Sequence, residues 1–189
     1  MDLGKIFYNT RSYTPIPFVI LVLVFAEPTV QSLIIGGAVV LLGALIRAWS
    51  VSHAGRTTRS TADYAAPELT TSGPYSFTRN PIYIGNVTIY MGIGIMSMAW
   101  FPWLQLAGLV FFSIQYHYII RGEEGFLEKQ FGEPYQKFLE NVPRVIPRFT
   151  PYNPDGGKGD WGMAFKSERR SLQAYLLTSL IIVAIYILR

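Results

Sequence analysis

Residues 30–51 read VQSLIIGGAVVLLGALIRAWSV, and they contain a single charged side chain, Arg47. Crossing the hydrocarbon layer of a membrane takes about 20 apolar residues in an α-helix, at roughly 1.5 Å of rise per residue. The stretch is long enough, and we expect Arg47 to extend its stem toward the lipid headgroups. The sequence therefore predicts a transmembrane helix here.

Four further apolar blocks surround this one, at Ile16–Ala26, Ile82–Trp100, Pro102–Ile120 and Ser171–Leu188. The two middle blocks carry no charge and meet at Phe101-Pro102, which predicts a tight helical hairpin. The first block is short, but the charge pattern described below requires it to cross. With 50% hydrophobic and 15% charged residues, the chain is too apolar for an ordinary soluble domain. We predict an all-α fold, an integral membrane bundle of about five transmembrane helices.

The basic residues give this bundle an orientation, since loops rich in Lys and Arg stay on the cytoplasmic side of a membrane. Three segments carry them: the N-terminus with Lys5 and Arg11, the loop after the second span with Arg56, Arg59 and Arg79, and residues 121–170. The turns at 27–29 and 100–102 carry none. The alternation predicts a cytoplasmic N-terminus and a C-terminus on the outer side.

Charge and composition also argue against several classes of function. The net charge of +4 comes from residues beside the spans, a distribution that suits anionic lipid headgroups better than nucleic acid. Cysteine is absent, which excludes disulfides, thiolate metal sites and cysteine nucleophiles. The only histidines are His53 and His117, without the spacing of a metal site, so we expect no metal. His117 suits either a proton carrier or a hydrogen-bonded structural role.

The chain divides at a stretch of Pro, Asn, Asp and Gly, residues 151–160. We expect a membrane core over residues 1–150, a linker and interfacial segment over 151–170, and a C-terminal transmembrane helix over 171–189. Gly85, Gly92 and Gly94 lie in an apolar helix with no preceding strand, so close helix packing explains them better than a dinucleotide loop.

One polar segment on the expected cytoplasmic side lies between Ser52 and Pro81. It contains the turn Thr70–Tyr75, and Asn80-Pro81 places a proline at the expected first turn of the next helix. The amides at this helix start, with Tyr75 and Tyr83 nearby, could bind an anionic or aromatic group of a ligand. The alternative is an ordinary helix start capped by Asn80, with tyrosines at the membrane interface.

A second polar segment begins at Glu123-Glu124, directly after an uncharged span. Ionisable groups at the edge of a membrane are costly, which makes the pair a candidate ligand for a cation. Alternatively, the glutamates are solvated and pair with Arg121 and Lys129. Beyond them, Gly132 and Pro134 break the helix, and the amphipathic stretch that follows is either a lid on the membrane or a surface helix packed on the bundle.

The order of these motifs carries a family resemblance. Thr71-Ser72-Gly73-Pro74-Tyr75 is followed by Arg79-Asn80-Pro81-Ile82-Tyr83-Ile84-Gly85, a hairpin, Glu123-Glu124, Phe131-Gly132-Glu133-Pro134-Tyr135 and Val142-Pro143-Arg144. The ordered set resembles the isoprenylcysteine carboxyl methyltransferase family and, more distantly, the membrane phospholipid N-methyltransferases. It covers about residues 42–149.

The resemblance implies an S-adenosylmethionine-dependent methyltransferase whose cofactor site lies at the cytoplasmic end of the bundle and whose apolar or lipid-like acceptor enters from the bilayer. Carried over residue by residue, the cofactor-binding set is Glu68, Leu69, Thr70, Tyr75, Asn80, Pro81, Ile82, Tyr83, Glu123 and Glu124. An amine or hydroxyl acceptor would need a base, for which Glu124 and His117 are the nearest candidates, whereas a carboxylate or thiolate acceptor needs none.

Two positions depart from the family pattern. The family usually has histidine where this chain has Asn80, although a side-chain amide still offers a donor and an acceptor. The prenylcysteine enzymes carry a substrate-binding arginine where this chain has Ile119, and Arg121, our third catalytic candidate, is near that position but out of register. The alternatives to a methyltransferase are a sterol-reductase-like enzyme with a nicotinamide cofactor and a non-catalytic membrane protein. The three acids of the expected site favour a cationic cofactor.

Overall fold

The computed structural model describes residues 3–55 and 66–189. Within these ranges the regular structure is helical throughout, without a strand. The helices are α1 (Leu3–Thr10), α2 (Pro15–Val24), α3 (Val30–Ala54), α4 (Pro81–Ser97), α5 (Trp103–Phe131), α6 (Glu133–Asn141) and α7 (Trp161–Leu188), with a 3₁₀ turn at Gly73–Ser76. The all-α fold predicted from the apolar blocks is confirmed.

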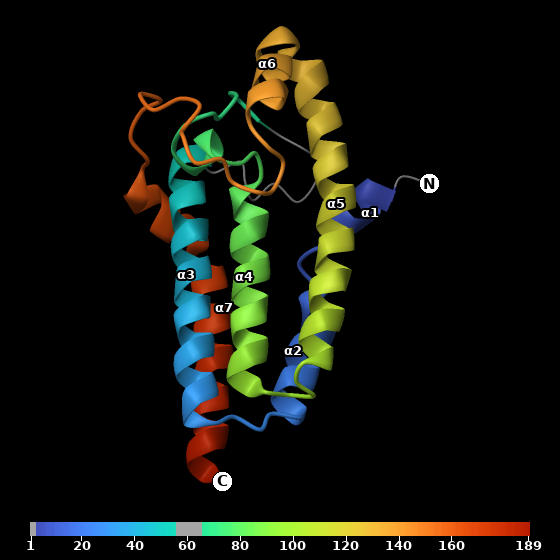
Figure 1. Cartoon of the computed structure of the whole chain (residues 1–189), viewed down its shortest axis with the longest axis vertical. Coiled ribbons are helices and arrows are strands. Elements are labelled where there is room, and N and C mark those ends of the chain that lie inside the picture. Colours follow the sequence, from blue (N-terminus) through green and yellow to red (C-terminus); the bar gives the residue numbers. More distant parts are fainter. Residues whose placement is uncertain (1–2, 56–65) are drawn as a thin grey trace.

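The long helices form a bundle in which α3, α4, α5 and α7 run along the long axis of the molecule (Figure 1). Of the described helices, α3, α5 and α7 are long and apolar enough to cross a membrane. Helix α4 has 17 residues and α2 has 10. The helical membrane bundle is therefore confirmed, and the crossing of α2 and α4 stays a prediction.

Helices α3 and α4 pack most closely, because glycines face each other along their contact. A Cβ atom added at Gly36 would lie 2.6 Å from the carbonyl oxygen of Gly92, and one added at Gly43 would lie 2.9 Å from that of Gly85. Real Cβ atoms do not approach so closely, so the two backbones touch where these glycines meet. The packing role predicted for Gly85 and Gly92 is confirmed.

Two helices are longer than their apolar blocks. Helix α5 continues past Ile120 to Phe131 and stops where Gly132 adopts a φ of +57°, a conformation that favours glycine. Helix α7 starts ten residues before Ser171, at Trp161, because the Asp160 side chain caps it by accepting a 2.8 Å hydrogen bond from the amide of Met163. The segment expected to be linker thus contains the first turns of a helix.

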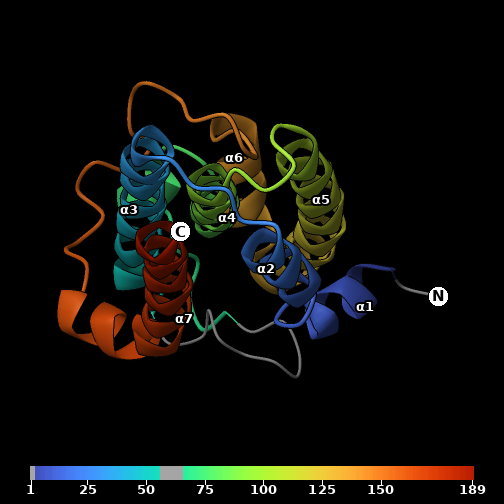
Figure 2. The same ribbon diagram turned by 90° about the horizontal axis from the view of Figure 1, so that it is seen from below.

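The two ends of the bundle differ in character. Helix α6 and the segments at 66–80 and 142–160 gather at one end, whereas the turns before α3 and α5 and the C-terminus lie at the other (Figure 1). Seen along the bundle, α7 lies beside α3, and α1 lies on the outer side near α5 (Figure 2). Tyr135, Phe138 and Val142 form a buried apolar cluster with Leu69. Helix α6 is therefore packed on the end of the bundle, over the loop that carries Leu69.

Candidate functional site at one end of the bundle

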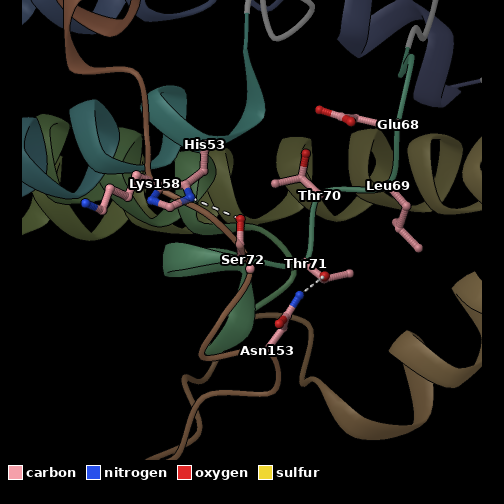
Figure 3. Close-up of a pocket in the computed structure, with 9 residues that line it drawn as sticks. His53, Glu68, Leu69, Thr70, Thr71, Ser72, Asn153 and Lys158 are labelled. Carbon is pink, nitrogen blue, oxygen red and sulfur yellow. Dashed lines mark hydrogen bonds between the residues drawn. The ribbon is translucent and has the colours of Figure 1, made fainter.

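The end that carries α6 contains a groove of about 270 Å³. It is lined by His53, Glu68, Leu69, Thr70, Thr71, Ser72, Asn153, Gly156 and Lys158. Figure 3 shows His53 facing Ser72, with Nδ1 and Oγ 3.1 Å apart, and Asn153 donating a 3.1 Å hydrogen bond to the hydroxyl of Thr71. Glu68, Leu69 and Thr70, for which the family resemblance implies a role in cofactor binding, all line the groove.

The far wall of the groove comes from residues that the motifs did not indicate. Asn153 and Lys158 lie about 80 residues after the Thr70–Tyr75 turn, and no local pattern connects them with it. They reach it because the segment after α6 is bonded to the residues before α4. The amide of Arg148 donates to the carbonyl of Phe77 at 2.9 Å, and the amide of Tyr152 donates to that of Ser76 at 3.0 Å.

Glu123 and Tyr83 meet between α5 and α4. The Tyr83 hydroxyl donates a 2.7 Å hydrogen bond to Oε1 of Glu123, and the rings of Tyr83 and Tyr116 lie 4.6 Å apart between centroids. Burial raises the pKa of Tyr75 well above its ordinary value, nearby Glu123 adds to that rise, and Arg47 opposes it. Two predicted site residues, Tyr83 and Glu123, are therefore in direct contact.

Glu124 has a different environment from its neighbour. Its carboxylate pairs with Arg79, at 2.9 Å, and with Arg144, which also donates from Nε at 3.1 Å. The glutamate is only 14% exposed, and both arginines come from the segments that close this end of the bundle. The pairing with Arg121 and Lys129 that the helical spacing offered is not the one formed. Glu124 instead joins the residues before α4 to those after α6.

The start of α4 is largely as expected. Pro81 occupies the first turn, and Asn80 is the residue at the N-cap position. The Asn80 side chain makes no capping hydrogen bond, however, and donates at 3.0 Å to the carbonyl of Arg144. The capping role considered for this side chain is therefore wrong, and the amide helps to hold the segment after α6. Ile82 is half-buried in the same turn.

His117 and Arg121 are not brought to this cluster. Both side chains are exposed and lie one helical turn apart on the outer face of α5, whereas Tyr116 and Ile119 are buried in the bundle. Ile119, which we align with the substrate-binding arginine of the prenylcysteine enzymes, packs in a cluster with Tyr8 and Tyr116. The structure thus separates two of the three catalytic candidates from Glu123 and Tyr83.

Arg47 forms a polar cluster inside the bundle that the sequence did not reveal. Its guanidinium pairs with Glu168 of α7 and also donates to the side-chain oxygen of Asn86. The Asn86 amide in turn donates a 3.1 Å hydrogen bond to the Tyr116 hydroxyl. Glu168 is 2% exposed. The expectation that Arg47 extends toward the lipid headgroups is wrong, because a buried carboxylate 121 residues away holds it in the bundle.

Among the residues that the structure describes, no three His, Cys, Asp or Glu side chains are grouped to hold a metal ion. That the site functions without a metal stays a prediction.

Two known proteins that are similar to part of this chain are both named as metal-resistance proteins. The chain is 34% identical over 106 residues to the cobalt-zinc-cadmium resistance protein CzcN of Cupriavidus metallidurans, a match that covers 55% of this chain and 45% of that protein. It is 32% identical over 85 residues to the nickel-cobalt-cadmium resistance protein NccN of Alcaligenes xylosoxydans xylosoxydans, covering 44% and 38%. The matches thus span less than half of each relative. No solved structure matches the chain.

The family model described as phospholipid methyltransferase matches residues 31–134, which is more than half of the chain. The matched region runs from α3 through the Thr70–Tyr75 turn, the α4–α5 hairpin and Glu123 to the start of α6. It favours methyl transfer over the reductase and non-catalytic alternatives. The chain therefore belongs to the phospholipid methyltransferase family, membrane methyltransferases related to the isoprenylcysteine carboxyl methyltransferases.

Proposed function

We propose that this protein transfers the methyl group of S-adenosylmethionine to an apolar or lipid-like acceptor, at the end of the bundle that carries α6. One observation carries the proposal: Glu123 is half-buried and accepts a hydrogen bond from the hydroxyl of Tyr83, with the charge of Arg11 nearby, whereas Glu124 pairs directly with two arginines. A carboxylate that is not neutralised by two paired arginines keeps more of its attraction for a cation. Glu123 is therefore the better ligand of the two for an ammonium group.

The residues of this region fit the chemical groups of the cofactor. S-adenosylmethionine carries an ammonium, a sulfonium, a carboxylate and an adenosine. Hydroxyl and amide side chains in the groove, among them Thr70, Thr71 and Asn153, suit the adenosine. The paired rings of Tyr83 and Tyr116 lie next to Glu123 and offer aromatic faces to a positive charge.

The cofactor supplies an activated methyl group, whose bond to sulfur breaks as a bond to the acceptor forms, leaving a neutral thioether. Such a displacement requires the protein to align the reactants and to exclude water, with no nucleophilic side chain. We assign alignment to Glu123, Tyr83 and Tyr75, and closure of the site to α6, whose apolar side covers the loop with Leu69.

The positions of the candidate bases indicate which kind of methyl acceptor the site can use. His117 is exposed on the outer face of α5, and Glu124 is held by Arg79 and Arg144. Neither is arranged to take a proton beside Tyr83 and Glu123. We therefore favour an acceptor that is already ionised, such as a carboxylate or a thiolate, over an amine or hydroxyl that must lose a proton. Arg121, also on the outer face, suits contact with an anionic lipid headgroup.

The proposal includes the arrangement of the chain in the membrane. We place α2, α3, α4, α5 and α7 across the bilayer, with the end that carries α6 in the cytoplasm. Residues 1–150 would then form the catalytic core, residues 151–170 an interfacial segment, and residues 171–189 a further membrane helix. Because residues 66–80, with Arg79, and the basic segment 142–160 lie at the α6 end, this orientation satisfies the positive-inside rule.

The test is binding first and turnover second. Purified protein in detergent is titrated with S-adenosylhomocysteine, and saturable binding is the expected result. The protein is then incubated with methyl-labelled S-adenosylmethionine and either extracted membrane lipids or small thiols, and the labelled product is identified. A well-folded sample with no saturable binding would rule out the proposed cofactor, and label found in no acceptor fraction would rule out methyl transfer to these classes.

A further inference from the structure

Glu168 on α7 lies at one end of a continuous series of contacts that finishes at Glu123. It pairs with Arg47 on α3, and Arg47 also donates to Asn86 on α4. Asn86 donates to the Tyr116 hydroxyl at 3.1 Å, and the Tyr116 ring lies 4.6 Å from the ring of Tyr83, which binds Glu123. Four helices of the bundle thus contribute to one network.

The ion pair in this network is not explained by stability alone. Glu168 is 2% exposed and the Arg47 side chain 16% exposed, so both charges have lost most of their contact with water. Replacing a buried ion pair by uncharged residues of similar size is often neutral or stabilising, because the pair has to overcome the cost of desolvation. A buried ion pair at this position therefore suggests a role in fixing the geometry around it.

Glu168 differs from the other residues of this network in its position along the chain. Arg47, Asn86, Tyr116, Tyr83 and Glu123 all lie within residues 31–134, the part of the chain that matches the family model. Glu168 lies beyond that region, in the segment 151–170 that we expected to be a linker and interfacial segment, and the structure places it in α7. Helix α7 packs along α3, which brings the carboxylate to Arg47.

We propose that Glu168 is a positioning residue of the methyltransferase site, and that α7 is required to complete that site. Its carboxylate fixes the Arg47 guanidinium, which orients Asn86 and, through it, the Tyr116 ring that supports Tyr83 against Glu123. Glu168 itself contacts neither cofactor nor acceptor. This inference rests on the proposed function, since Tyr83 and Glu123 are the groups that it serves.

The test removes both charges together, so that neither is left buried alone. The double variant Arg47→Gln with Glu168→Gln is compared with the wild type for melting temperature and for the Kd of S-adenosylhomocysteine. We expect a melting temperature near that of the wild type and a Kd raised about tenfold, equivalent to about 1.4 kcal/mol. A double variant that binds as the wild type does would overturn the positioning role of the pair, whatever its melting temperature.

A second variant tests the positioning role of Glu168 if the double variant does not fold. Asn86→Leu keeps the ion pair and a similar side-chain volume but breaks the link from Arg47 to Tyr116. It should fold and show a similar rise in Kd, and wild-type binding by this variant would overturn the proposal. Thr178→Val, at a buried polar position on α7 that bonds only within its own helix turn, is the control and should leave the Kd unchanged.

The same measurements separate this inference from the proposed function. If the wild type binds no S-adenosylhomocysteine, the proposed function itself fails. If the wild type binds and the double and Asn86→Leu variants bind equally well, only the role of Glu168 fails.

Discussion

The hydroxyl of Tyr83 on α4 lies 2.7 Å from Oε1 of Glu123 on α5 and donates a hydrogen bond to it. The next residue, Glu124, is bound instead by Arg79 and Arg144. Two adjacent carboxylates of one helix therefore differ in their partners: Glu123 accepts from Tyr83 near the charge of Arg11, and Glu124 pairs with two arginines that hold the end of the bundle together. This division gives opposite expectations for their replacement.

Replacing Glu123 by Gln should weaken cofactor binding and leave folding nearly unchanged. Gln keeps an oxygen that can accept from Tyr83, but it loses the charge that attracts an ammonium group. The loss should be about 2 kcal/mol, or about thirtyfold in the Kd of S-adenosylmethionine measured by titration. Glu128→Gln is the control, since Glu128 is an exposed acid further along the same helix. Equal affinities of the two variants would mean that Glu123 is not the cofactor's carboxylate ligand.

Replacing Glu124 by Gln should lower stability. The change leaves Arg79 and Arg144 without their carboxylate, and Arg79 is only 12% exposed. Loss of such charge-assisted hydrogen bonds costs about 2 kcal/mol, which should appear as a lower melting temperature in detergent.

The matched control is Glu133→Gln, which removes an exposed pair with Lys137 at 2.8 Å. Exposed pairs contribute less than about 1 kcal/mol. If the Glu124 variant melts no lower than the Glu133 variant, Glu124 does not stabilise this end of the bundle.

The positions of the helices could be predicted well from local sequence. Uninterrupted apolar blocks give α3, α4, α5 and α7, and Asn80-Pro81 gives the start of α4. The starts and ends in polar sequence were harder to predict, because residues 161–170 have the composition of a surface segment. Asp160 is a local capping signal for this helix start, but the partner of Glu168 is provided only by the folded chain.

For the candidate site too, local motifs could be predicted from the sequence and long-range contacts could not. The turn at Thr70–Tyr75 and the Glu123-Glu124 pair are local motifs, so their proximity to a common end of the bundle could be expected. The partners of the charged groups could not, because Arg144 lies 20 residues after Glu124 and Glu168 lies 121 residues after Arg47. No periodicity connects residues at such separations. Whether Glu124 is solvated or paired depends on these distant partners, so the sequence alone could not decide it.

The contact between α3 and α4 predicts different effects for two adjacent glycines. At Gly36 an added Cβ would lie 2.6 Å from the carbonyl oxygen of Gly92, whereas at Gly37 nothing lies within 4 Å. Gly36→Ala should therefore force the helices apart and destabilise the protein by about 1–3 kcal/mol. Gly37→Ala should be neutral or slightly stabilising, since alanine favours the helix over glycine by up to about 1 kcal/mol. Equal melting temperatures of the two variants would contradict the packing described here.

The last prediction concerns the orientation of the chain. Helix α6 and the polar segments with Arg79, Arg144 and Lys158 lie at one end of the bundle, and the C-terminus lies at the other (Figure 1). Because basic segments are retained in the cytoplasm, a reporter tag in the segment 151–160 should be on the cytoplasmic side and one at Arg189 on the opposite side. A tag before Lys5 should also be cytoplasmic, which requires α2 to cross despite its 10 residues.

The tags are compared in intact and permeabilised cells by protease accessibility. An N-terminal tag on the same side as the tag at Arg189 would show an even number of crossings and remove α2 or another helix from the set of spans. Basic substitutions near the start of α3, such as Glu27→Lys in the preceding turn with Gln31→Arg in the first helical turn, should reduce the preference for this orientation, because they place positive charge on the outer side. Unchanged accessibility in that variant would mean that packing of the bundle, and not the distribution of Lys and Arg, fixes the orientation.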